Sequence, residues 1–198
     1  MKKLLILALV CSGIISASAQ DFAKNLATAK SSYSAGDLEN ARFAMQQMIT
    51  EIDIALGREV LKLLPAKLEA MPANTKSDNV TANSGLAGVM IHRDYGTGDK
   101  ISNIDIMGNS PLVASLNAIL QLPFMGNSGD GTQKVIKVDG YKGMLQKSVD
   151  SETNKTDYTL QIPLNSSLLT LVVPNSTEAE VIKIANTIPV SQIAKMVQ

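Results

Sequence analysis

The chain has 198 residues, with 18 lysines and arginines against 18 aspartates and glutamates, one histidine, one cysteine and no tryptophan. This balanced charge argues against nucleic acid as a partner, because phosphate binding needs a concentrated basic surface. Beyond the N-terminal segment, no apolar run approaches the roughly 18 residues of a membrane-spanning helix. A single cysteine forms no intrachain disulfide, so a hydrophobic core must stabilise the fold.

Residues 1–19 have the pattern of a secretory signal peptide. Lys2 and Lys3 form its positive start, an apolar run follows at 4–10, and Ala17-Ser18-Ala19 matches an A-x-A-type cleavage site. The pattern predicts cleavage after Ala19 and a mature chain that is periplasmic or secreted. Cys11, the only cysteine, would leave with the signal peptide.

Residues 20–64 are predicted to form a helical hairpin. Apolar residues recur there at steps of three and four, the period of one helical face: Phe22, Leu26, Ala29 and Tyr33 in the first helix, and Leu38, Ala41, Met45, Met48, Ile52 and Ala55 in the second. Gly36 interrupts the pattern, Asp37 suits the N-cap of the second helix, and Pro65 ends that helix. Gly57 is expected at an exposed position, where glycine costs up to ~1 kcal/mol relative to alanine.

The segment from Ala29 to Ala41, with Tyr33, Gly36 and Leu38 between them, resembles the turn of a tetratricopeptide repeat. A repeat array needs about three copies for stability, and no second copy follows, so we expect a single hairpin. The second helix is apolar on more than one stripe, and two helices cannot bury both faces against each other. We therefore expect Met45, Ile49, Ile52 and Leu56 to pack on the chain's own sheet, on a partner or on a second copy.

Residues 65–84 are predicted to form a linker. The stretch from Pro72 to Asn79 is polar and rich in turn residues, and it shows neither helical nor strand periodicity. It separates the helical pattern from the strand pattern that follows.

Residues 85–198 are predicted to form an α+β domain, and its first segment, 89–95, alternates apolar and polar side chains as a strand does. In the first predicted hairpin, pairing Tyr95 with Lys100 would set Ile91 opposite Ile104 on the apolar side. The polar side would then carry His92, Asp94, Asn103 and Asp105.

The remaining elements follow from turn and cap signals. Ser110 is expected to cap a helix whose apolar face is Leu112, Leu116, Ile119 and Leu120. Asp139-Gly140 and Asn165-Ser166 predict two hairpin turns, the first flanked by strands at 135–138 and 141–149. Thr177 and Glu180 form a capping box that opens a last amphipathic helix, with a short helix after Pro189.

The predicted fold class is therefore α+β, with an N-terminal helical hairpin followed by a mainly antiparallel sheet that two amphipathic helices cover. The element order is similar to that of PsbP/Mog1-like α/β/α sandwiches, with Asn186-Thr187-Ile188-Pro189 near the C-terminus looking like their shared ending. The mature chain also resembles uncharacterised secreted proteins of Bacteroidetes-type bacteria. Fold resemblance alone assigns no function.

The single histidine is the first candidate for a catalytic or metal-binding residue. His92, Asp94 and Asp105 share one side of the predicted hairpin, where an imidazole and two carboxylates would suit a metal or an oriented base. The simpler interpretation, which we favour, is a solvated strand face with no catalytic, cofactor or metal site.

We accordingly expect an exported, non-enzymatic envelope protein that binds a protein or another envelope component and needs no cofactor. One alternative is a carrier that holds a small apolar ligand in a cleft between sheet and helices, lined by Leu112, Leu116, Ile162 and Leu169. The other is a metal-assisted hydrolase built on His92, Asp94 and Asp105.

Overall fold

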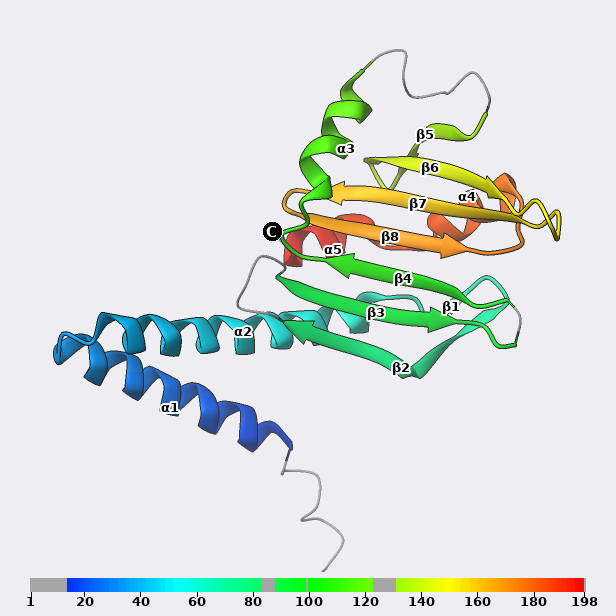
Figure 1. Cartoon of the computed structure of the whole chain (residues 1–198). Helices are drawn as coiled ribbons and strands as arrows, with labels where there is room; N and C mark the ends of the chain where they lie inside the picture. Colours follow the sequence, from blue (N-terminus) through cyan, green and yellow to red (C-terminus); the bar gives the residue numbers. More distant parts are fainter. Residues whose placement is uncertain (1–13, 83–87, 99, 123–130, 198) are drawn as a thin grey trace, which may run out of the picture. The chain divides into compact units, whose positions relative to one another are not determined.

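A computed structural model describes residues 14–82, 88–98, 100–122 and 131–197. These residues form five helices and an eight-stranded antiparallel sheet, which confirms the α+β class (Figure 1). They divide into a helical unit that ends at Asp53 and a sheet unit that begins at Ile54. The predicted signal peptide, 1–19, lies outside the described residues except for 14–19, which begin the first helix.

The helical unit consists of α1 (Ile14–Ser34) and the larger part of α2 (Leu38–Leu63), as predicted. Gly36 has a φ of 78°. The Gly36 amide donates to the Tyr33 carbonyl, and the Asp37 amide donates to that of Ser32, a Schellman pair of bonds that ends α1. Asp37 then caps α2, since its carboxylate accepts from the Asn40 amide at 3.1 Å.

Small residues form the contact between the two helices. Ala29 and Ser32 of α1 are buried, as are Ala41 and Ala44 of α2. Two side-chain bonds cross from one helix to the other: Asn25 donates to Glu51 at 2.8 Å, and Asn40 donates to Ser32 at 3.0 Å. Residues near the start of α1 thus meet residues far along α2, as in an antiparallel pair.

The sheet unit contains eight strands in the order β1-β2-β3-β4-β8-β7-β6-β5 (Figure 1). Every pair of neighbouring strands in this order is antiparallel. Their bounds are β1 Lys67–Leu68, β2 Met71–Ala82, β3 Val89–Tyr95, β4 Ser102–Met107, β5 Gln133–Val138, β6 Tyr141–Val149, β7 Thr156–Leu164 and β8 Ser167–Val173. The helices of this unit are α3 (Leu112–Gln121), α4 (Glu178–Ala185) and α5 (Val190–Met196).

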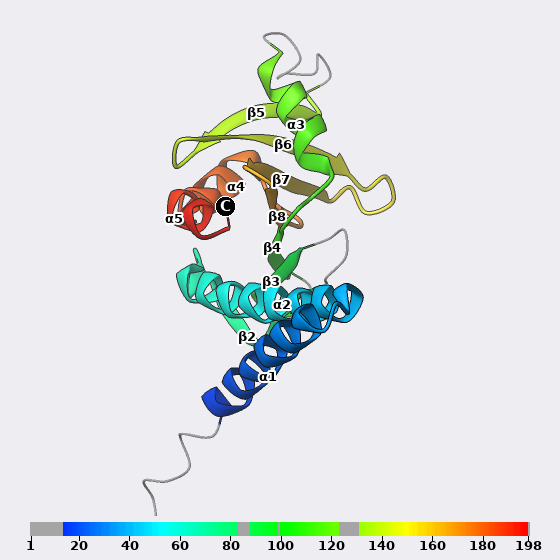
Figure 2. The same cartoon turned by 90° about the vertical axis from the view of Figure 1, so that its left-hand side faces the viewer.

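Helices pack on both faces of the sheet, whereas the sequence predicted that two helices would cover one apolar face. The main core lies on one face and combines strand residues with α4, α5 and the end of α2, which contributes Val60, Leu61 and Leu64. A second cluster sets α3 against Met144 and Leu168, whose neighbours Leu145 and Leu169 belong to the main core. Because side chains alternate along a strand, α3 lies on the opposite face from α4 and α5 (Figure 2).

The predicted linker at 65–84 is wrong, because this segment contains β1 and β2. Its polar residues form an irregularity in β2: Asn74 pairs with Asp94 and Asn79 with His92, so the residues 75–78 lie opposite Arg93 alone. The predicted domain boundary also moves, since the end of α2 belongs to the sheet unit. A polar stretch without periodicity can therefore be a bulged strand when it has a buried partner to satisfy.

That buried partner is Arg93, which is only 8% exposed. Its Nε and Nη2 donate to the two carboxylate oxygens of Asp78 at 2.7 and 2.6 Å, a bidentate pair. Its Nη1 donates to the Leu64 carbonyl just after α2, at 3.4 Å. One guanidinium thus connects the β2 bulge, β3 and the end of α2.

The predicted faces of the β3–β4 hairpin are correct, but the predicted register is wrong by two residues. Tyr95 pairs with Ser102 instead of Lys100, and Ile91 with Ile106 instead of Ile104. The turn is longer than expected because both Gly96 and Gly98 adopt positive φ. A shift of two residues leaves every side chain on its predicted face.

The later hairpins form as predicted. Asp139 and Gly140 both have positive φ, as a two-residue type I′ turn requires. Leu160 pairs with Leu171 and Ile162 with Leu169, all of them buried. The capping box of Thr177 and Glu180 is also present at the start of α4.

The expected cap of α3 does not form. Pro111 occupies the N-cap position, and the Ser110 hydroxyl is buried without a hydrogen-bond partner in the described part of the chain. The Ser110 amide instead donates to the Ser166 carbonyl at 2.9 Å. Leu112 is 53% exposed, so the buried face of α3 is Val113, Leu116 and Leu120.

Gly57 is buried against the sheet, where the sequence predicted an exposed position. A Cβ atom at Gly57 would lie 2.5 Å from a Val80 methyl carbon and 3.0 Å from a Val89 methyl carbon. Glycine is therefore needed for α2 to approach β2 and β3.

We predict that Gly57→Ala destabilises the chain, although helix propensity alone would favour alanine by up to ~1 kcal/mol. Overpacking against Val80 and Val89 costs about 1–3 kcal/mol and should prevail. Urea unfolding measures the difference, with Gly57→Ala/Val80→Ala as the relieving variant. A more stable single variant would show that α2 does not pack closely here.

We also predict that Asp78→Ala lowers the free energy of unfolding by about 3 kcal/mol, because it leaves the buried Arg93 guanidinium unpaired. Lys76→Ala, an exposed change in the same bulge, should alter it by less than about 0.5 kcal/mol. Chemical denaturation of the two variants checks both values. Equal effects would mean that the bulge, and not the ion pair, carries the stability.

Candidate functional site

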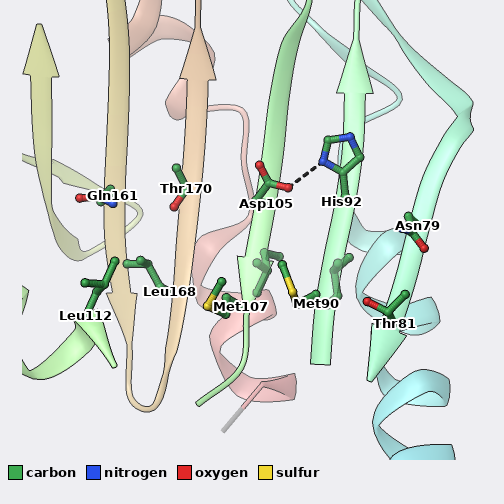
Figure 3. Close-up of a pocket in the computed structure, with 12 residues that line it drawn as sticks. Asn79, Thr81, Met90, His92, Asp105, Met107, Leu112, Gln161, Leu168 and Thr170 are labelled. Carbon is green, nitrogen blue, oxygen red and sulfur yellow. Dashed lines mark hydrogen bonds and ion pairs between the residues drawn. The ribbon is translucent and has the colours of Figure 1, made fainter. Parts of the chain in front are cut away.

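The candidate site lies on the face of the sheet that α3 covers only in part. Figure 3 shows two rows of side chains that run across the strands on this face. The polar row is Asn79, His92, Asp105, Thr170 and Gln161. The second row is mainly apolar and consists of Thr81, Met90, Met107 and Leu168, with Leu112 of α3 at its end.

Strand register produces both rows. In the polar row, His92 pairs with Asn79 on one side and with Asp105 on the other, and Thr170 pairs with both Asp105 and Gln161. In the second row, Met107 is the register partner of both Met90 and Leu168. Partners in register project from the same face, so a polar row across five adjacent strands lies beside a mainly apolar row across four of them.

A cavity of about 210 Å³ lies along these rows, and both rows contribute to its lining. Pockets for drug-sized ligands are usually about 300–1,000 Å³. The cavity is therefore of a size for one or two side chains of a binding partner. Met90 is 44% exposed at its edge, which leaves apolar surface available next to the polar row.

His92 lies between two carboxylates. Its Nδ1 is 2.7 Å from Asp105 Oδ1, and its Nε2 is 3.1 Å from Asp94 Oδ1. Asn103 donates to the second oxygen of Asp105 at 2.6 Å. The three residues predicted from the sequence are thus brought together, with one carboxylate at each edge of the ring.

These contacts change the protonation of the ring. Burial lowers the pKa of His92, but the hydrogen bonds and negative charges of Asp105 and Asp94 outweigh it, so the pKa lies above 6.5. The imidazolium form donates from both nitrogens and satisfies both carboxylates. In that form the ring links β3 to β4, because Asp105 belongs to β4.

This arrangement is unfavourable for the hydrolase alternative. A metal bound at Nε2 could take only His92 and Asp94 from the cluster, because Asp105 lies at the other edge of the ring, whereas catalytic zinc sites use three protein ligands. Across the described ranges, no group of three or more His, Cys, Asp or Glu residues could hold a metal ion. Among the described residues, the side-chain partners of His92 are the carboxylates of Asp94 and Asp105, and neither partner is a hydroxyl nucleophile.

The cleft expected for an apolar carrier is not formed by the residues proposed for it. Leu112 lines the cavity on the α3 face, and Leu116 packs in the small α3 cluster beside it. Ile162 and Leu169 are fully buried in the main core on the other face. The sheet itself separates the two pairs.

Sequence reasoning missed most of the site. Asn79 and Thr81 fall in the predicted linker, and no sequence pattern proposes a role for Met90 or Met107. Thr170 and Gln161 alternate with core residues, which placed them on the polar face but did not place them beside Asp105. That placement depends on the pairing of β4 with β8, which no local pattern encodes.

A scan against protein-family models, a search of curated proteins and a search of solved structures each found no match to this chain. The resemblances drawn from its sequence therefore stay predictions. Within the part of the chain that the structure describes, no helix is both long and apolar enough to cross a membrane.

We predict that the pKa of His92 lies above 6.5 in the folded protein and falls when Asp105→Asn removes one carboxylate. Proton NMR measures it directly, because His92 is the only histidine. Asp150→Asn, at a distant exposed turn, should leave the titration unchanged. A wild-type value at or below 6.5 would contradict the paired geometry.

The same shift fixes the sign of the pH dependence of stability. Because the pKa of His92 is higher in the folded than in the unfolded chain, protonation favours folding. This contribution is complete below pH 6.5 and is lost as the pH rises through the folded pKa. Asp105→Asn should therefore flatten the fall in unfolding free energy over that interval.

Proposed function

We propose that this protein is an exported, non-enzymatic binding module that holds a segment of a partner protein on the open face of its sheet. Export rests on the pattern of residues 1–19. The binding role rests on one observation: a polar row across five strands lies beside a mainly apolar row across four of them, on a face with a side-chain-sized cavity. Such a surface suits an extended or helical segment with one apolar and one polar edge.

The polar row indicates what the segment presents. Both ring nitrogens of His92 contact carboxylates, those of Asp94 and Asp105. The groups of this cluster that can still bind a partner are therefore carboxylate oxygens, which accept hydrogen bonds. Asn79 and Gln161 add amides at the two ends of the row. A partner segment with N–H donors, such as lysine or arginine side chains, complements this row, while its apolar side chains meet Met90 and Met107.

Two properties favour binding over catalysis. The histidine is paired at both nitrogens, and the cavity is below the usual volume of a site that encloses a small molecule. A carrier of a small apolar ligand would also need an enclosed apolar cleft, and the residues expected to line one lie on two faces of the sheet.

The experiment is recovery of partners by the tagged mature chain from its native envelope. Met90→Asp places a charge in the apolar row and should abolish recovery of the specific partner. Val149→Asp is the matched control, because Val149 is exposed to a similar extent, 52%, but lies outside the two rows. Thermal unfolding confirms that both variants fold, and equal recovery by both would refute the proposed surface.

A further inference from the structure

Several large apolar side chains of the helical unit lie outside the contact between its two helices and are exposed. Leu26 and Tyr33 on α1 are 51% and 68% exposed, and Met45, Ile49 and Ile52 on α2 are 47–57% exposed. With Leu38, these residues are called here the hairpin stripe. Scattered exposed apolar residues are ordinary, but a contiguous set marks an interaction surface.

All members of the stripe lie on one side of the helix pair. Tyr33 follows the interface residue Ala29 by four positions, and Met45 follows Ala41 by four, which places each about 40° around its helix in the same rotational sense. Because the helices are antiparallel, equal rotations bring both sets to a common side. Phe43, which is 58% exposed, lies on a different side of α2.

Two charged residues flank the stripe on α2 without partners. Within the described residues, Arg42 and Asp53 form no ion pair and no side-chain hydrogen bond. Partial burial raises the pKa of Asp53, and no neighbouring cation offsets that rise. Arg42 and Asp53 thus place a cation and an anion 11 residues apart on a single helix.

We propose that the hairpin stripe is the interface of a symmetric dimer, in which α2 packs antiparallel against α2 of a second copy. Leu38, Met45 and Ile52 recur every seven residues, and Ile49 lies four residues after Met45 and three before Ile52, the spacing of a helix seam. A two-fold axis near the middle of this run sets Met45 against Ile49 of the second copy, and Ile49 against Met45 of that copy.

The same axis places Arg42 of each copy beside Asp53 of the other copy, so that two such pairs form. A surface that is complementary to itself in both shape and charge is what a two-fold interface requires. An unrelated partner would have to supply both charges in the right order, whereas a second copy has them by symmetry. Two helical hairpins joined in this way bury their exposed sides in a four-helix arrangement.

The test is the association state of the full mature chain, measured by sedimentation equilibrium over a range of concentrations. We expect a dimer, lost in Ile49→Asp and retained in Phe43→Asp, which alters a side chain of equal exposure on another side of the same helix. Arg42→Asp or Asp53→Arg alone should weaken dimerisation by roughly tenfold. The double reversal Arg42→Asp/Asp53→Arg should restore it, and Lys24→Asp should have no effect.

Three results would overturn the proposal. One is a wild-type chain that stays monomeric at its highest soluble concentration, and another is a dimer that survives Ile49→Asp. The third is a charge reversal that the double variant does not rescue. Circular dichroism and thermal unfolding of each variant separate loss of association from loss of folding. The outcome is independent of Met90→Asp, so the two surfaces are tested separately.

Discussion

The buried guanidinium of Arg93 is the constraint on which the sheet unit depends. Arg93 is 8% exposed, so its guanidinium needs hydrogen-bond partners within the protein. Leaving this buried charge unpaired would cost more free energy than most single contacts contribute to stability. The β2 bulge exists to bring the Asp78 carboxylate to it, and the carbonyl after α2 satisfies a third donor. β3 is then fixed against β2, which places His92 and Met90 on the opposite face.

The candidate site is a by-product of this register. Once β3 is fixed, strand pairing alone aligns Asn79, His92, Asp105, Thr170 and Gln161 in one line. Because core residues alternate with site residues along each strand, the same pairing that buries Ile91 and Ile106 places their neighbours on the opposite face. A binding surface of the proposed kind would have its side chains on strands that are already paired, which limits the conformational entropy lost on binding.

Much of the fold follows from local patterns, and the parts that do not have identifiable causes. The caps at Asp37 and Thr177 and the turn at Asp139-Gly140 are encoded within a few residues, so they were predicted correctly. The bulged strand was not predicted, because its polar residues lie opposite Arg93, which is distant in sequence. Gly57 was misjudged for the same reason, since its neighbours Val80 and Val89 come from other elements. Within the candidate site, the proximity of His92, Asp94 and Asp105 was predicted. The polar and apolar rows were not, because their alignment depends on the order of the strands in the sheet.

The bulge in β2 also affects the edge of the sheet, where a strand of another molecule could pair. β2 lies next to the edge of the sheet, where only the two residues of β1 pair with its beginning. A regular edge of this length would present a ladder of free amides and carbonyls on which a foreign strand could add. The excursion at 75–78 breaks that ladder, and Lys76 adds a charge to it. Strand addition is thereby discouraged at this edge, a form of protection against amyloid-like stacking.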